Sequence, residues 1–293
     1  MMQLNVLISA YACEPGKGSE PAVGWNVVRE VSKYHKVWVL TSNCHRLGIE
    51  NELIRNPNPN LNFIYFDPFS LTIDWSSKGK QTQKWVHLHY YLWQIWAYFV
   101  GKSLHNQIGF DFVHHVTYVR YSSPSFISLL PIPFVWGPVG GGESAPKAFC
   151  KDLSSRGKTY ESLRNLARSV GELDPFVKLT AQQSVSTWAT TDDTAIRLLK
   201  IGAKNVQVSS QLGLSSEEIA ILAGYPISKN NSPIRFISVG RLLHWKGFHM
   251  GLAAFARANL SDNVEYWIVG EGPEQQRLQN ICQELGIEKQ VKF

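Results

Sequence analysis

The strongest constraint on the fold is a regular alternation between two kinds of segment. Short apolar runs typical of buried strands are followed by longer segments whose apolar residues recur at helical spacing. Such alternation is typical of a parallel sheet with helices on both faces, so we predict an α/β fold. Strands are expected over residues 4–9, 36–41, 61–66, 112–116, 134–137, 186–190 and 205–209, and a helix over 19–34 with Ser19 as its N-cap.

The amino-acid composition of the chain changes near residue 209. Serine, glycine, asparagine and proline are frequent up to residue 233, and the alternation then restarts. Strands are expected over 234–239 and 264–269, helices over 248–258 and 274–285, and the opening of another strand at 290–293. We therefore predict two domains, residues 1–208 and 209–293, of which the second is incomplete.

Composition excludes several classes of protein. The 293 residues are 44% hydrophobic, which excludes disorder as the main state, and the net charge of +6 is too small for a dense nucleic-acid-binding surface. No apolar run approaches the roughly 20 residues of a membrane-spanning helix, and the first eight residues lack the basic start of a signal peptide. The four cysteines show no metal-ligand spacing. We expect a cytoplasmic protein without a bound metal or cofactor.

Two glycine-containing loops follow expected strands of the first domain. Gly16 and Gly18 lie between a strand and a helix N-terminus, where backbone N–H groups can approach an anion. The dinucleotide-binding fingerprint fails, because Pro21 occupies the position of its third glycine. The second loop contains Gly140, Gly141, Gly142 and Glu143. Each loop also has a purely structural interpretation, the first as a tight turn and the second as a flexible connector.

Two histidines close the strand expected over 112–116. Because adjacent strand residues point to opposite faces of a sheet, His114 and His115 cannot both serve one site. The sequence leaves open which of them faces a ligand, and the other is interpreted as a structural histidine.

Charged residues and glycines follow both strands of the second domain. Arg241 and Lys246 come after the first of these strands, and Arg with its planar fork and Lys with its point charge could converge on a diphosphate. The alternative is a solvated pair of charges. Gly270, Glu271 and Gly272 follow the next strand in the same way.

An aromatic segment covers residues 85–104, with lysines at 84 and 102. It is interpreted as a helix packed on both sides, with contact to a membrane surface as the alternative.

The motifs together resemble the group 1, family 4 glycosyltransferases. The resemblance rests on residues 237–242 with 246–248, on 268–273, on the loop 9–20, and on the segments 114–117 and 136–143. It implies the GT-B architecture, two Rossmann-like domains facing each other across a cleft. It also implies retaining, metal-independent transfer of a sugar from a nucleotide-diphosphate sugar to a polysaccharide or lipid-linked acceptor. If the aromatic segment meets a membrane surface, we expect peripheral contact at the inner face.

The resemblance also implies roles for single residues. Arg241 and Lys246 match the diphosphate clamp, and Gly270, Glu271 and Gly272 lie near the donor nucleotide. His115 matches the histidine beside the transferred sugar. The glycine loops, with Glu143, would line the cleft.

The family also has two glutamates seven residues apart, which hold the donor sugar, and the sequence stops at Phe293 before this pair. We therefore expect a fragment or a truncated homologue. The alternatives to a transferase are a non-catalytic binding remnant and a GT-B nucleotide-sugar epimerase.

Overall fold

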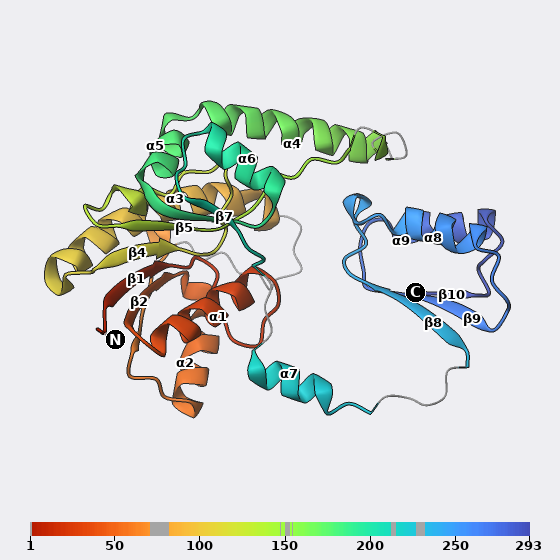
Figure 1. Cartoon of the computed structure of the whole chain (residues 1–293), viewed down its shortest axis with the longest axis horizontal. Helices are drawn as coiled ribbons and strands as arrows, with labels where there is room; N and C mark the ends of the chain where they lie inside the picture. Colours follow the sequence, from red (N-terminus) through yellow and green to blue (C-terminus); the bar gives the residue numbers. More distant parts are fainter. Residues whose placement is uncertain are drawn as a thin grey trace. The chain divides into compact units, whose positions relative to one another are not determined.

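The computed structural model describes residues 2–70, 82–146, 148–149, 153, 155–211, 215–226 and 232–293. It divides into two compact units (Figure 1). The first contains Met1–Ser144 and Leu166–Ser215, and the second contains Ala145–Asn165 and Ser216–Phe293. Residues Ala145–Asn165 thus group with the second unit, although the sequence analysis included them in a first domain ending at 208. Among the described helices, none is both long enough and apolar enough to cross a bilayer.

The first unit is built on a seven-stranded parallel sheet in the order β3-β2-β1-β4-β5-β6-β7. This confirms the predicted α/β class, and the seven predicted strands begin and end within two residues of the observed ones. The strands are β1 (Asn5–Ser9), β2 (Lys36–Thr41), β3 (Leu61–Tyr65), β4 (Phe112–His115), β5 (Phe134–Val139), β6 (Ser184–Ala189) and β7 (Val206–Val208).

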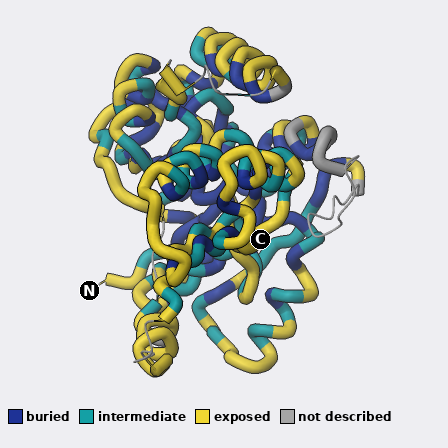
Figure 2. Tube along the Cα trace, turned by 90° about the vertical axis from the view of Figure 1, so that its right-hand side faces the viewer, coloured by how far each residue is buried: buried dark blue, intermediate teal, exposed yellow. Residues whose placement is uncertain are grey.

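Helices cover both faces of this sheet because its strands are apolar on both sides. In β1, Val6 and Ile8 face a core shared with α1 (Glu20–Ser32) and α2 (Arg46–Arg55). Leu7 faces the opposite core, which contains residues of α3 (Thr82–Ile108), α5 (Pro175–Gln183) and α6 (Asp192–Lys200). All three β1 side chains are fully buried, and Figure 2 shows such buried positions in dark blue. The remaining long helix is α4 (Ser155–Leu173).

The start of α1 differs from the prediction in one detail. Ser19 is at the N-cap position, but its side chain forms no capping hydrogen bond. The reason is its backbone, which has φ 60° and ψ −137° in place of the extended conformation of a standard N-cap.

The aromatic segment forms part of α3 and buries one face only. Trp93 and Ala97 are fully buried in the core, whereas Leu88 and Phe99 are 51% and 63% exposed. The interpretation as a helix packed on both sides is therefore wrong, because the sheet covers only one side of α3. The side chains of Lys84 and Trp85 lie outside the described residues.

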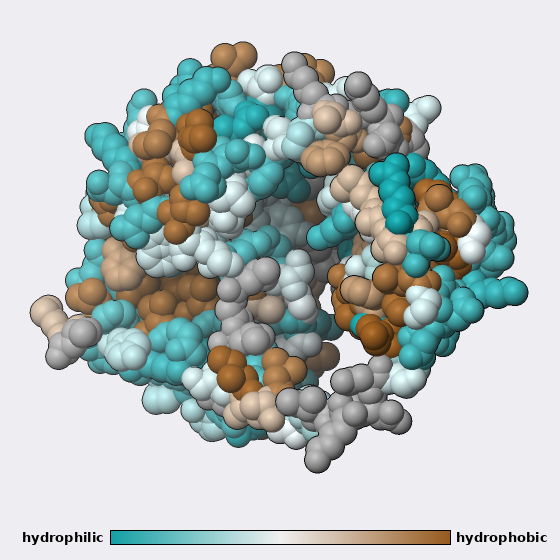
Figure 3. Space-filling model, turned by 45° about the vertical axis from the view of Figure 1, so that its right-hand side comes forward, coloured by the Kyte–Doolittle hydropathy of each residue, from teal (hydrophilic) through white to brown (hydrophobic). Residues whose placement is uncertain are grey.

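The second unit contains a three-stranded parallel sheet in the order β10-β9-β8. Helices α8 and α9 supply Leu252 and Leu278 to its core. Strand β8 is at the edge, and Ile237 and Val239 are 63% and 72% exposed. Figure 3 shows that apolar side chains, in brown, remain on the surface of the molecule. The elements are α7 (Ser216–Ala223), β8 (Ile234–Val239), α8 (Phe248–Arg257), β9 (Val264–Val269), α9 (Gln275–Glu284) and β10 (Val291–Lys292).

Candidate active site

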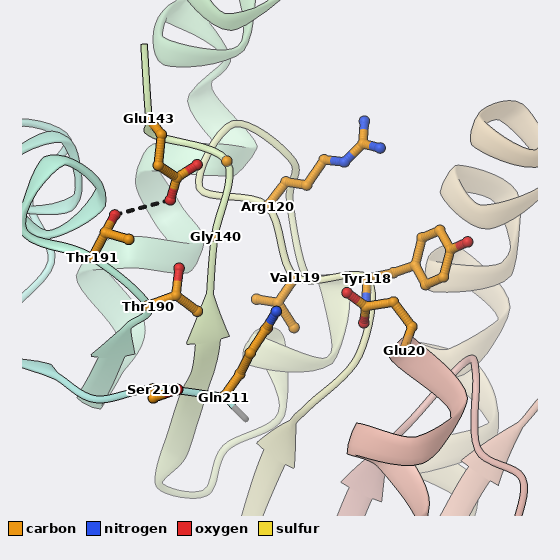
Figure 4. Close-up of a pocket in the computed structure, with 11 residues that line it drawn as sticks. Glu20, Tyr118, Val119, Arg120, Gly140, Glu143, Thr190, Thr191, Ser210 and Gln211 are labelled. Atoms are coloured by element: carbon orange, nitrogen blue, oxygen red, sulfur yellow. Dashed lines mark hydrogen bonds between the residues drawn. The ribbon is translucent and has the colours of Figure 1, made fainter. Parts of the chain in front are cut away.

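A cavity of about 540 Å³ opens in the first unit, beside the loops that follow β4, β5 and β6 (Figure 4). Parallel strands place their carboxyl ends at one edge of the sheet, and ligands of open α/β sheets bind there. The cavity is polar, since two carboxylates, an arginine and several hydroxyl groups line it. The lining residues are Glu20, Tyr118, Val119, Arg120, Gly140, Gly141, Glu143, Thr190, Thr191, Ser210 and Gln211.

Glu20 joins the start of α1 to the loop after β4. Its Oε2 accepts a hydrogen bond of 2.9 Å from the backbone N–H of Tyr118. Burial raises the pKa of Glu20 above its ordinary value, although this hydrogen bond and the charge of Arg120 oppose the shift. Ser19 and Tyr118 both have positive φ, 60° and 62°, which is strained for residues other than glycine. Strained backbone therefore lies at both ends of the Glu20 contact.

Glu143 is held by the N-terminus of α6. Its Oε1 accepts hydrogen bonds of 2.9 Å from the hydroxyl groups of both Thr191 and Thr194. Burial alone would raise the pKa of Glu143, but these hydrogen bonds, one from its own backbone N–H and the nearby Arg168 together lower it. Glu143 is therefore ionised at neutral pH.

Two glycines of the loop after β5 line the cavity, whereas the glycines of the loop after β1 do not. Gly140 and Gly141 line the cavity, and Gly141 has φ +93°. Gly142 is buried, and its backbone N–H donates to the Thr194 hydroxyl. Gly16 and Gly18 are exposed and are not among the lining residues.

The two histidines are buried and are not among the residues that line the cavity. His115 Nε2 is 3.0 Å from the Tyr90 hydroxyl and 3.1 Å from the Thr117 carbonyl oxygen. His114 Nε2 is 2.6 Å from the Gly137 carbonyl oxygen, on the other face of the sheet. Burial lowers the pKa of His114 to about 4 and that of His115 to about 3, so both rings are neutral at pH 7. The assignment of His115 to the transferred sugar stays a prediction.

In the second unit, the loops after β8 and β9 form one edge. The backbone N–H of Leu242 donates to the Glu271 carbonyl oxygen at 2.9 Å, and the N–H of Glu274 donates to the Leu242 carbonyl oxygen at 3.2 Å. A Cβ on Gly270 would overlap the Gly240 carbonyl oxygen, and one on Gly272 would overlap that of Leu242. The glycines thus allow two backbones to pack directly against each other.

This edge presents two cationic side chains. Arg241 and Lys246 are exposed, and within the described part of the chain neither forms a side-chain hydrogen bond or an ion pair. Lys246 is the last residue of a short 3-10 helix, His244–Lys246, directly before α8. Both cationic groups are therefore free to bind an anion, close to the Gly270–Gly272 turn.

Comparison with known proteins identifies this part of the chain. Residues 226–293 match a protein family described as glycosyl transferases group 1. This segment is therefore similar to part of that family's domain. It contains the two charged residues of the predicted clamp, Arg241 and Lys246, and the Gly270–Gly272 turn. No curated protein sequence matches the chain.

Solved structures of GT-B glycosyltransferases resemble the whole chain and confirm the predicted fold. Sucrose-phosphate synthase from Thermosynechococcus elongatus has a TM-score of 0.52 at 14% identity, covering 100% of this chain and 70% of its own. The apo form of the lipopolysaccharide outer core galactosyltransferase WaaB has a TM-score of 0.51 at 13% identity, and the match covers 98% of this chain and 67% of WaaB. Anabaena Alr3699/HepE in complex with UDP has a TM-score of 0.50 at 14% identity, and the match covers 100% of this chain and 68% of the Anabaena protein. At these identities the likeness shows the fold alone.

Sequence reasoning missed several residues of the first-unit cavity. Tyr118 and Arg120 follow β4 by three and five residues, in a loop without glycine or any recognised motif. Thr190 directly follows β6 and Thr191 is the N-cap of α6, and the only available signal was the expected strand end at 190. Glu20 belonged to the recognised loop but had no role assigned to it.

Proposed function

We propose that the chain is part of a glycosyltransferase that moves a hexosyl group from a nucleotide-diphosphate sugar to a polysaccharide or lipid-linked acceptor, with retention of configuration and without a metal. The observation that carries the proposal is a pair of exposed cations, Arg241 and Lys246, that have no side-chain partner among the described residues. They lie on the loop whose backbone is hydrogen-bonded to the Gly270–Gly272 turn. The group 1 match over 226–293 supports it, as does the UDP bound to the structurally similar Anabaena protein.

The chemistry of transfer explains why cations are needed at this edge. When the bond between the sugar and the diphosphate breaks, its electron pair and the negative charge move to the departing diphosphate. Arg241 and Lys246 would stabilise this charge through charge-assisted hydrogen bonds, the role that a metal ion has in other transferases. Glu271 is the middle residue of this turn. We propose that it lies near the donor nucleotide, together with Gly270 and Gly272.

The first unit would hold the acceptor. Its cavity combines ionised Glu143 with the hydroxyl groups of Thr190 and Thr191, which suit the hydroxyl groups of a sugar. His115, buried and neutral, would act through its hydrogen-bonded neighbours beside the transferred sugar. We further propose a cytoplasmic protein that contacts the inner face of a membrane through the exposed side of α3.

Calorimetric titration with UDP tests the proposal. Arg241→Ala removes a charge-assisted contact worth about 1.5–3 kcal/mol, which corresponds to a rise in Kd of roughly 10- to 150-fold. Arg257→Ala is the matched control, because Arg257 is exposed at the other end of α8. An unchanged Kd for Arg241→Ala, or an equal loss for Arg257→Ala, contradicts the assignment.

A further inference from the structure

A second, smaller cavity of about 80 Å³ lies next to α3 in the first unit. Tyr118 and Arg120 line both this cavity and the larger one, so the two are neighbours. At this volume the small cavity has room for a substituent of a sugar and not for a whole sugar ring. Its other polar lining residues are Tyr90, Tyr91, Gln94 and Ser123.

The charge of the small cavity is positive. No aspartate or glutamate of the described chain lines it, whereas the larger cavity has two glutamates. Arg120 is exposed and, among the described residues, forms no side-chain hydrogen bond or ion pair. Figure 4 shows its guanidinium group extending away from Glu143, to the same side of the loop as the Tyr118 ring.

The buried amide of Gln94 adds hydrogen-bond donors to this cavity. His115 is neutral and has one N–H, and its Nε2 lies 3.1 Å from the Thr117 carbonyl oxygen, which can only accept. The proton is therefore on Nε2. The Gln94 amide lies 3.1 Å from the same nitrogen and must turn its oxygen toward it, because two N–H groups would repel.

In that orientation the NH₂ group of Gln94 occupies the amide position remote from His115. Gln94 is only 1% exposed, and the amide atom remote from His115 has no hydrogen-bond partner among the described residues. That atom has almost no exposed surface, so a ligand in the small cavity reaches it only after a change of the Gln94 side-chain rotamer. A buried donor without a partner costs about 1–3 kcal/mol, so such a change is favoured when a ligand accepts the hydrogen bond. The small cavity then offers donors from Arg120, Gln94, Ser123 and the tyrosines.

We infer that the acceptor carries an anionic substituent, a carboxylate or a phosphate, and that this group binds in the small cavity against Arg120 and Gln94. The inference rests on the proposed function, since it names the chemical class of the acceptor. The neutral part of the same sugar extends into the larger cavity. There Glu20 and Glu143 accept hydrogen bonds from hydroxyl groups and repel a second anion.

Binding of three monosaccharides without nucleotide tests the inference. The probes are glucose, glucuronate and glucose 6-phosphate, measured by saturation-transfer NMR titration. The chain should bind at least one anionic probe about tenfold more tightly than glucose, and the preferred probe distinguishes a carboxylate from a phosphate. Arg120→Gln should remove this preference by lowering the affinity for the anionic probe to that for glucose, and Arg257→Gln should leave the preference intact.

The inference is overturned if the three probes bind equally, if none binds, or if Arg120→Gln keeps the preference for the anion. UDP titration of the same proteins separates this result from the proposed function. A chain that binds no UDP refutes the donor site in the second unit, whereas the probe measurements concern the first unit alone. A loss of UDP affinity in Arg120→Gln also overturns the inference, because Arg120 would then belong to the donor site.

Discussion

Gly270→Ala is the change with the best-defined structural effect on the proposed donor edge. Gly270 has φ +144°, and an added Cβ would overlap the backbone oxygen of Gly240, which cannot rotate away. The positive φ costs an alanine about 1–3 kcal/mol. Forced separation of the two loops adds about 1–3 kcal/mol more, as in an overpacked core. We therefore expect a loss of about 2–6 kcal/mol in the local stability of the second unit.

Gly286→Ala is the matched control for this prediction. Gly286 also has a positive φ, +68°, but a Cβ there meets nothing within 4 Å. It therefore suffers the backbone strain alone, about 1–3 kcal/mol.

Hydrogen exchange measured by mass spectrometry on peptides from residues 264–287 reports the local opening free energy of both variants. Gly270→Ala should accelerate exchange far more than Gly286→Ala, and it should also weaken UDP binding. Equal acceleration by the two variants would show that the contact between the loops contributes nothing.

Three further predictions concern the first unit. Thr194→Val leaves the Gly142 N–H without its acceptor and removes one donor to Glu143, so the free energy of unfolding should fall by about 1–3 kcal/mol in denaturant titration. Folding lowers the pKa of His115, so between pH 6.5 and about 3 the unfolded chain binds more protons than the folded chain. The free energy of unfolding should therefore decrease by about 1.4 kcal/mol for each unit by which the pH is lowered across this range. The slope should be shallower in His115→Gln, and an unchanged slope would refute the assignment of this effect to His115. If the exposed side of α3 meets a membrane, anionic vesicles should bind the protein more than neutral ones in a salt-dependent way, by about 1 kcal/mol per basic residue; equal partition at low salt contradicts it.

The sequence predicts the sheets well because their strands are apolar on both faces. A strand such as β1, with Val6, Leu7 and Ile8 in succession, leaves little choice between exposed and buried positions. The opposite directions of His114 and His115 also follow from strand geometry and are confirmed by their different partners.

Other features depend on tertiary contacts that no local pattern contains. The helix α7 forms inside the segment rich in serine, glycine, asparagine and proline between residues 209 and 233. Its eight residues are too few for the spacing of apolar residues to indicate a helix. The unusual backbone of Ser19 directly precedes Glu20, whose carboxylate accepts a hydrogen bond from Tyr118, 98 positions away. Arg120 lines two cavities because it lies on the loop after β4, which also contributes Tyr118 to both.

The hydrogen bonds of Leu242 have a consequence for how tightly a donor can bind. Its N–H and C=O connect the loop that carries Arg241 to the turn before α9 on both sides, so the two loops cannot move independently. The backbone around Arg241 is therefore ordered before any ligand arrives, and binding need not supply that conformational entropy. Only the side chains of Arg241 and Lys246 remain to be immobilised, at about 0.5–1.5 kcal/mol each. A substitution in the turn before α9 that breaks either hydrogen bond would weaken donor binding without touching the donor, because Arg241 would then start from a disordered loop.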